Sequence, residues 1–201
     1  IHSGFVENAW YKNKFWIKLF YPLSIIFSLV SKYRRKKMSK TSWKPSVKTI
    51  VVGNITVGGN GKTPFVIWLV NTLKRNGFKP GIISRGYKSS SKKFPLHIDL
   101  NTDVYHSGDE AKIIANSTNC PVVIGPKRVN SAKYLLDNFD CDILITDDGL
   151  QHYALGRDIE IAMVDGIKKF GNQLMLPAGP LREPIDRLNE VDFVINTNSF
   201  F

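Results

Sequence analysis

The chain has 201 residues, and 43% of them are hydrophobic, which supports a packed core and excludes a disordered chain. Its net charge of +11 is uneven, because residues 1–49 carry eleven lysines and arginines against one acid, Glu7. The remainder is therefore nearly neutral, which argues against a nucleic-acid-binding domain with basic residues across its folded surface. The two cysteines, Cys120 and Cys141, predict buried free thiols in a reducing compartment and exclude a disulfide framework.

An apolar, aromatic segment near the start of the chain runs into a basic one. Residues 15–30 contain one charged side chain, Lys18, and six lysines and arginines follow by residue 40. As a helix, such a segment spans ~24 Å, short of the ~30 Å hydrocarbon core of a bilayer. We therefore expect a helix that lies in the interface of an anionic membrane, held by aromatic and basic side chains. An amphipathic helix packed on the folded domain is the alternative.

The next stretch carries the clearest chemical signal. An apolar, β-branched run at residues 50–52 leads into a glycine-rich turn, and helical spacing of apolar residues follows Pro64. A strand, a glycine loop and a helix form the context of a phosphate-binding loop, in which backbone N–H groups and a helix N-terminus face phosphate oxygens. The predicted nucleotide-binding residues are Thr56, Val57, Gly58, Gly59, Asn60, Gly61, Lys62 and Thr63.

Short apolar strands then alternate with helices. Strands are predicted at residues 80–87, 121–125, 142–149, 159–164 and 191–196, with helices after residue 108 and at 128–138. This alternation is typical of a parallel sheet with helices on both faces. The predicted fold class is thus α/β, a P-loop NTPase-like, mostly parallel sheet at residues 49–201. A membrane-associating segment and linker at residues 1–48 precede it.

Candidate catalytic residues gather at the carboxyl ends of these strands, where parallel α/β sheets bind ligands. Asp147 and Asp148 follow an apolar strand, the position from which P-loop enzymes hold nucleotide-bound Mg²⁺. Asp109 and Glu110 open a helix, where an acid serves either as a helix cap or as a general base or metal ligand. His152 lies four residues after Asp148, and a histidine near such acids is a further candidate.

Arginines complete the set of candidates. Arg182 and Arg187 lie on either side of Glu183-Pro184, so they either bind phosphate or form ion pairs with Glu183 and Asp186.

Five motifs in this order resemble one family, the tetraacyldisaccharide 4′-kinases, which act on a precursor of lipid A in Gram-negative bacteria. They are Gly53-Asn54-Ile55-Thr56-Val57-Gly58-Gly59-Asn60-Gly61-Lys62-Thr63-Pro64, Ser84-Arg85-Gly86-Tyr87, Gly108-Asp109-Glu110, Asp147-Asp148-Gly149-Leu150-Gln151-His152 and Leu176-Pro177-Ala178-Gly179-Pro180-Leu181-Arg182-Glu183-Pro184. The set covers nearly the whole chain and is far more specific than the phosphate loop alone. Thr56 departs from the strict G-x-x-x-x-G-K-[ST] pattern, but the family commonly has serine or threonine there.

The resemblance implies an ATP- and Mg²⁺-dependent kinase that phosphorylates the 4′-hydroxyl of an acylated glucosamine disaccharide 1-phosphate to give lipid IVA. It implies a location on the cytoplasmic face of the inner membrane. The implied roles are catalysis for Asp109, Asp147 and Asp148, metal binding for Thr63, Glu110 and Asp148, and substrate binding for Arg85, Arg128, His152 and Arg182. Family members carry a second, smaller α/β lobe, so we expect this chain to correspond to the N-terminal lobe. The histidine that partners the base in the family lies in the other lobe.

Two other functions remain open at this point. One is a generic P-loop ATPase or GTPase, although no Asn/Thr-Lys-x-Asp guanine signature is present. The other is a membrane-peripheral module that binds nucleotide without catalysis. ATP turnover that depends on an acylated disaccharide distinguishes the kinase from both, and the sequence leaves the oligomeric state open.

Overall fold

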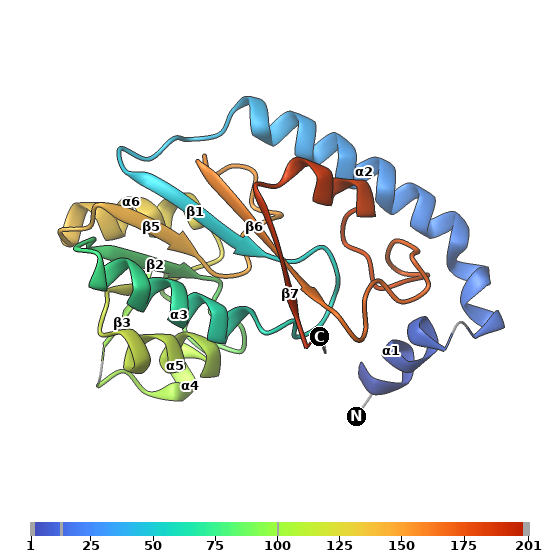
Figure 1. Cartoon of the computed structure of the whole chain (residues 1–201), viewed down its shortest axis with the longest axis horizontal. Coiled ribbons are helices and arrows are strands. Elements are labelled where there is room, and N and C mark those ends of the chain that lie inside the picture. The colour runs from blue at the N-terminus through green and yellow to red at the C-terminus, as the bar shows by residue number, and fades with distance from the viewer. Residues whose placement is uncertain (1–2, 13, 100, 199–201) are drawn as a thin grey trace.

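The computed structural model describes residues 3–12, 14–99 and 101–198. In these residues a seven-stranded sheet has the order β3-β4-β2-β5-β1-β6-β7 (Figure 1). Neighbouring strands pair in parallel except β3 with β4, which are antiparallel. The strands are β1 (Lys48–Gly53), β2 (Pro80–Ser84), β3 (Leu96–Ile98), β4 (Val122–Ile124), β5 (Ile143–Thr146), β6 (Ile159–Asp165) and β7 (Phe193–Thr197).

Helices cover both faces of the sheet, as predicted. On one face, α3 (Lys62–Arg75) and α5 (Asp109–Thr118) pack on strand side chains that include Ile82 and Ile145. On the other face, α6 (Arg128–Asn138) packs on the neighbouring side chains Ile83 and Leu144. Successive residues of a strand point to opposite faces, and every residue of β2 and β5 is buried, so both sides of these strands need cover. Two shorter helices are α4 (Val104–Ser107) and the 3-10 helix η2 (Ile185–Glu190).

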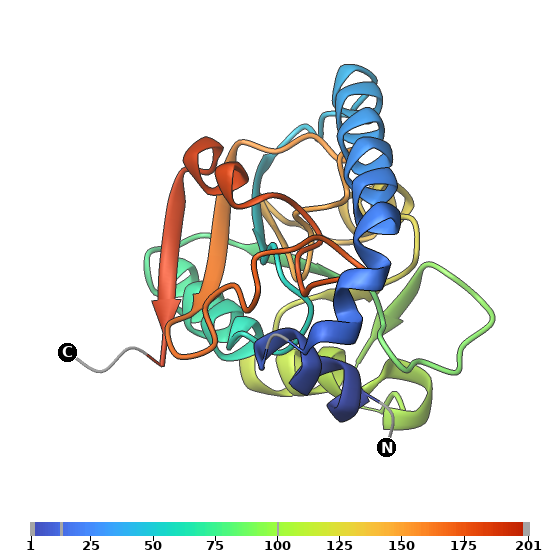
Figure 2. The same ribbon diagram turned by 90° about the vertical axis from the view of Figure 1, so that its right-hand side faces the viewer.

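The N-terminal part forms α1 (Ser3–Tyr11), the 3-10 helix η1 (Phe15–Phe20) and the long helix α2 (Tyr21–Lys40). Figure 2 shows this segment beside the loop that follows β6. The Trp10 indole donates to the Pro177 carbonyl at 3.0 Å, and the Ser24 hydroxyl donates to the Met175 carbonyl at 2.8 Å. The segment is therefore docked on the domain along one side.

The opposite side of the same helices is apolar and exposed. Phe15, Leu19, Leu23, Ile26 and Leu29 each leave about half or more of their surface in solvent. In the described residues, the stretch Phe15–Lys40 is long and apolar enough to cross a membrane, with a mean hydropathy of 1.3 in its apolar window. Only 11% of that window is buried, so the domain leaves most of this apolar surface uncovered.

Several boundaries differ from the prediction for local physical reasons. α2 continues to Lys40 because lysine and arginine are good helix formers. α3 begins at Lys62, before Pro64, because a proline in the first helical turn removes an N–H that has no helical acceptor. The predicted strands at 80–87 and 142–149 end at Ser84 and Thr146, where the motif residues turn away.

Three further features were missed or misjudged. The sequence predicted neither β3, which has only three residues, nor α1. Cys120 and Cys141 are free, as predicted, but they are half-buried and not buried.

Candidate active site

The loop at residues 54–61 joins the buried strand β1 to α3. The Lys62 side chain extends back over this loop to its first residue, Asn54. Gly61 caps α3 with a φ of +68°, a left-handed conformation that glycine adopts without strain. The Lys62 Nζ donates to Asn54 Oδ1 at 3.2 Å and lies 3.6 Å from Asp148 Oδ1. Only 14% of the Lys62 side chain is exposed. The ammonium group is thus held at the mouth of a phosphate-binding loop and above an acid.

Thr56, which departs from the strict loop pattern, has a structural use in the loop. Its hydroxyl accepts a hydrogen bond from Asn60 Nδ2 at 2.9 Å and is 3% exposed. The backbone on either side is fixed as well, because Val57 N donates to Pro180 O at 2.8 Å and Arg182 N donates to Ile55 O at 2.7 Å. A threonine therefore braces the loop through a bond that glycine cannot make.

Asp147 and Asp148 lie beyond the end of β5 in different electrostatic surroundings. Burial, followed by the charge of Glu110, raises the pKa of Asp147 to about 6, and the residue is 2% exposed. Burial acts against ionisation of Asp148 too, but Lys62 and Arg182 outweigh it and lower its pKa below the ordinary value. Arg182 Nη1 lies 3.1 Å from Asp148 Oδ2. Arg182, for which the sequence left two roles open, thus forms an ion pair inside the site.

The donor set fits a magnesium ion. Among the described residues, Asp147 Oδ1 is buried and has no hydrogen-bond partner. Those residues contain no preformed group of three or more histidine, cysteine or acidic side chains. Magnesium is usually held by one or two carboxylates and completed by water and substrate phosphates, so a preformed cage is not needed. Asp147 and Asp148 supply oxygen ligands of the right kind, and Lys62 at the start of α3 lies 3.6 Å from Asp148.

Asp109 is the first residue of α5 and is exposed. The cap position belongs to Gly108, and no side chain caps this helix, so the helix-cap alternative for Asp109 is wrong. Gly108 has a φ of +76°, and a Cβ there would overlap the Tyr87 carbonyl. Only glycine permits this approach, which places the Arg85 turn directly beside the start of α5.

Arg128 lies behind the acids and not in the open site. It is 2% exposed, and its guanidinium donates to Gly125 O at 2.7 Å and to Asp147 O at 3.4 Å. Burial lowers its pKa to about 10, and the charges of Asp148 and Asp147 oppose that shift. In this arrangement Arg128 braces the backbone of the acidic loop, and its proposed contact with substrate stays a prediction.

A cavity of about 390 Å³ lies between α2 and the site. It brings together three of the predicted substrate-binding residues, Arg85, His152 and Arg182, with the carboxylate of Asp148. Its other lining residues come mainly from α2 and from the loop before Arg182: Phe27, Val30, Ser31, Arg34, Gln151, Tyr153 and Leu176. One end of the cavity is therefore charged, and another part is apolar.

His152 is neutral at physiological pH in this setting. Burial and the charge of Arg128 lower its pKa from 6.5 to about 4. Because the pKa of His152 is lower in the folded state than in the unfolded state, protonation favours unfolding. The free energy of unfolding therefore has its full value above pH 6.5 and decreases as pH falls towards 4. We expect His152→Asn to reduce the acid-induced loss of unfolding free energy between pH 7 and 4.5 by about 2–3 kcal/mol relative to the parent chain. Denaturant titrations at both pH values measure this.

The control for that comparison is His106→Asn, which changes an exposed histidine on α4. Equal pH dependence in the His152 and His106 variants would show that His152 titrates normally.

Four residues that organise this site were not among the predicted catalytic, nucleotide-binding, metal-binding or substrate-binding residues. Asn54 holds Lys62, while Gln151, Tyr153 and Glu183 form a buried hydrogen-bonded group beside the cavity. Asn54 is a polar residue directly after a buried strand, which was a usable signal. The other contacts join residues about thirty positions apart, and no local pattern reveals them.

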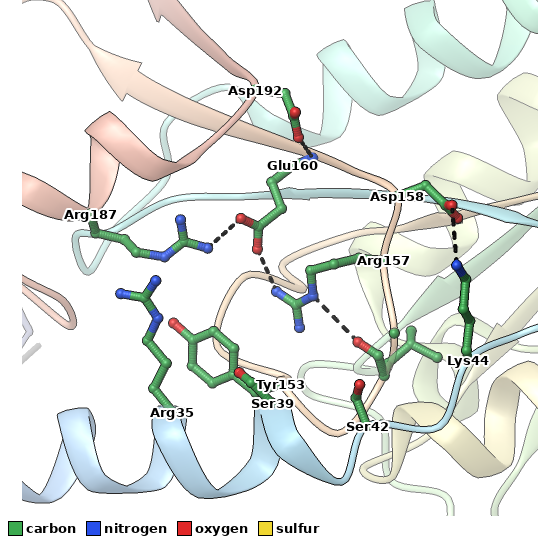
Figure 3. Close-up of a pocket in the computed structure, with 12 residues that line it drawn as sticks. Arg35, Ser39, Ser42, Lys44, Tyr153, Arg157, Asp158, Glu160, Arg187 and Asp192 are labelled. Carbon is green, nitrogen blue, oxygen red and sulfur yellow. Dashed lines mark hydrogen bonds and ion pairs between the residues drawn. The ribbon is translucent and has the colours of Figure 1, made fainter.

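Arg187 differs from Arg182 in its partners. It is 2% exposed and pairs with Glu160 at 2.5 Å and with Glu183 at 3.3 Å. Figure 3 shows it beside Arg35 and Tyr153, in a charged pocket at the far end of α2. Its role is an ion-paired structural one.

Comparison with known proteins identifies the family. The family model for tetraacyldisaccharide-1-P 4′-kinase (LpxK) matches residues 16–200. A tetraacyldisaccharide 4′-kinase of Vibrio campbellii is 50% identical over 198 residues, and one of Vibrio cholerae is 47% identical. Each alignment covers 94% of this chain and 58% of the relative, so the chain spans well under two thirds of their length.

A solved structure agrees. LpxK from Aquifex aeolicus, crystallised in complex with ATP, superposes with a TM-score of 0.82 and 31% sequence identity. The match covers 92% of this chain and 62% of that protein. The family resemblance and the fold class inferred from the sequence are both confirmed. This chain belongs to the tetraacyldisaccharide-1-P 4′-kinase family.

Proposed function

We propose that the chain forms the ATP-binding part of a kinase that phosphorylates the 4′-hydroxyl of a tetraacyldisaccharide 1-phosphate. The observation that carries this proposal is the placement of Lys62, at the start of α3, against Asp148 at the end of β5. ATP in the Aquifex structure and the names of the relatives support it. In this proposal residues 1–48 associate with the membrane and residues 49–201 form the kinase domain.

The loop residues 56–63 bind the phosphates of ATP through their backbone N–H groups and the N-terminus of α3. Lys62 exchanges its contacts with Asn54 and Asp148 for the β- and γ-phosphates. Phosphoryl transfer depends mainly on positioning and on neutralisation of charge, so this cation is the first requirement.

Thr63, Asp148 and Glu110 hold Mg²⁺, with Asp147 beside them. The ion, when bound, neutralises charge on the phosphates. When Lys62 moves from Asp148 to the phosphates, the Asp148 carboxylate becomes available to the metal ion, and Arg182 still holds it in place. Arg128 keeps the backbone of this loop fixed.

Asp109 accepts the proton of the sugar hydroxyl as it attacks. Asp109 is exposed at the start of α5, next to Glu110, and the charge of Glu110 contributes to the raised pKa of Asp147. A carboxylate at this point orients the hydroxyl and removes its proton.

The disaccharide lies in the cavity beneath α2. Arg85 and Arg182 are suited to its 1-phosphate or sugar oxygens, because guanidinium groups bind phosphate with two parallel bonds. Phe27, Val30 and Leu176 supply the apolar wall for part of an acyl chain. The neutral His152 is able to donate or accept a hydrogen bond to a sugar hydroxyl.

In this proposal the protein lies on the cytoplasmic face of the inner membrane, and the exposed apolar side of η1 and α2 supports an association with a membrane. Four exposed lysines in the second half of α2, Lys32, Lys36, Lys37 and Lys40, then face an anionic lipid surface. The acyl chains of the substrate and the helix would enter the same layer.

Liposome flotation tests this placement. A variant with serine in place of four exposed apolar residues, Leu19, Leu23, Ile26 and Leu29, is expected to dissociate from vesicles that contain anionic lipid. Each apolar side chain that is removed weakens insertion. High salt should weaken binding of the parent chain, because the basic residues are screened. The control is Ile113→Ser with Ile167→Ser, which changes exposed apolar residues elsewhere. Parent protein that stays unbound at low salt would contradict the placement.

Acceptor-dependent ATP turnover tests the function. ADP release is expected to rise when tetraacyldisaccharide 1-phosphate is added to the full-length protein, meaning this chain with whatever further segments belong to it. Equal ADP release with and without the acceptor would instead favour a generic P-loop ATPase.

A further inference from the structure

Resting on the proposed function, we propose that Glu183 is a positioning residue for the acceptor. It fixes the Gln151 side-chain amide so that the amide oxygen faces the cavity beneath α2 and accepts a hydrogen bond from a sugar hydroxyl. Gln151 is then a specificity-determining contact, and Glu183 acts through it.

The orientation of the Gln151 amide follows from its two partners. One end of the amide lies 3.0 Å from the Asn54 carbonyl oxygen and 2.8 Å from Glu183 Oε1. Both partners are acceptors, so the end that faces them must be the NH₂ group, which has two donors. Each of its hydrogens therefore has its own acceptor.

The other end of the amide is left for a ligand. Gln151 is half-buried and lines the cavity together with Asp148, His152 and Arg182. Among the described residues, its Oε1 has no hydrogen-bond partner, and it is not among the buried atoms that lack one. The free acceptor therefore lies near the Asp148 carboxylate, the neutral His152 and the Arg182 cation, and a hydroxyl is a group that can donate to it.

Glu183 is held firmly enough to impose this orientation. It is 2% exposed, Tyr153 Oη donates to its Oε2 at 2.5 Å, and Arg187 Nε lies 3.3 Å from the same oxygen. The Tyr153 ring lies against the guanidinium groups of Arg35 and Arg157, at 5.8 and 5.1 Å from its centroid (Figure 3). Burial and these contacts therefore hold the Glu183 carboxylate in one orientation.

This geometry predicts what the isosteric variant Glu183→Gln does. Tyr153 donates to the Oε2 position and the Arg187 guanidinium lies 3.3 Å from it, so the oxygen of the new amide stays there. Its NH₂ group then faces the NH₂ group of Gln151. Gln151 either loses the bond or turns over, and in the second case its nitrogen, not its oxygen, faces the cavity.

The experiment measures steady-state kinetics and melting temperature in the full-length protein. Glu183→Gln is expected to raise KM for the acceptor about tenfold, the usual effect of one lost hydrogen bond, and to leave KM for ATP unchanged. Asp186→Asn, which neutralises an exposed acid three residues away, should change neither value. A purely structural role would instead lower the melting temperature and kcat without a selective change in acceptor KM.

Two further arms identify Gln151 as the residue through which Glu183 acts. Gln151→Met should raise acceptor KM by a similar factor, and the double variant should be no worse than Gln151→Met alone. Monodeoxy acceptors each lack one free hydroxyl other than the 4′-hydroxyl, and for one of these analogues the acceptor KM of the parent should rise about tenfold. The acceptor KM of Gln151→Met should not rise further with that analogue. This comparison decides the question even if Glu183→Gln does not fold.

Additive effects in the double variant, or unchanged acceptor KM in Gln151→Met, would overturn the inference while leaving the kinase proposal intact. Absence of phosphate transfer by the parent protein would instead remove the proposed function itself.

Discussion

Asp109→Asn is expected to lower turnover of the full-length protein by at least ~10², because a general base typically contributes 10²–10⁴ to the rate. Asparagine keeps the size of the side chain but does not accept the proton. ATP binding should be unchanged, since in the proposed mechanism Asp109 contacts the attacking hydroxyl and not the nucleotide. Melting should shift little, because no hydrogen bond caps α5 through this side chain. The loss is limited to an interaction of a first-turn acid with the helix dipole, ~0.3–1 kcal/mol.

The matched control is Asp103→Asn on the same loop. Asp103 caps α4 by accepting from Tyr105 N, and asparagine retains most capping ability. Parent-like turnover in both variants would remove Asp109 from the chemistry, and Asp147 would become the next candidate for the base.

Lys62→Ala is expected to weaken Mg·ATP binding ~10–100-fold, since a hydrogen bond to a charged group contributes ~1.5–3 kcal/mol. Turnover should fall further if the ammonium group also stabilises charge that develops during transfer. The fold should remain, because Asp148 keeps its ion pair with Arg182. Isothermal titration with Mg·ATP and steady-state turnover measure the two effects.

Lys93→Ala serves as the control, because it removes an exposed lysine away from the loop. If Lys62→Ala bound and turned over ATP as well as Lys93→Ala, the phosphate-loop assignment would be wrong.

The sequence was most informative where function and structure are local. The phosphate loop, the apolar strands and the helix at 128–138 are contiguous patterns, so residue spacing alone predicted them. The acids after β5 were recognisable for the same reason, because a buried strand of three apolar residues and a threonine ends directly before them.

The roles of individual side chains depended on contacts that no spacing encodes. Arg182 and Asp148 are 34 residues apart, and their ion pair arises only because the loop after β6 folds back over the phosphate loop. Arg128 was predicted to bind substrate and Arg187 to be either a phosphate ligand or an ion-pair partner, and each is 2% exposed. Burial of a charged group is a tertiary property, because it requires partners from other elements.

The N-terminal helix shows a third kind of limit. Its composition indicated an interfacial helix or a packed one as alternatives, and the structure contains features of both. One side of the segment α1-η1-α2 is docked through Trp10 of α1 and Ser24 of α2, while its other side leaves Leu19 of η1 80% exposed. Composition describes a whole segment, whereas the two sides of a helix meet different surroundings.

Transfer of radiolabel from γ-labelled ATP to tetraacyldisaccharide 1-phosphate measures the proposed reaction itself, with this chain and the full-length protein assayed side by side. We predict that the full-length protein places the label on the 4′-oxygen of the lipid and that Lys62→Ala and Asp109→Asn reduce that labelling. Label that appears only as inorganic phosphate, at a rate independent of the lipid, would contradict it.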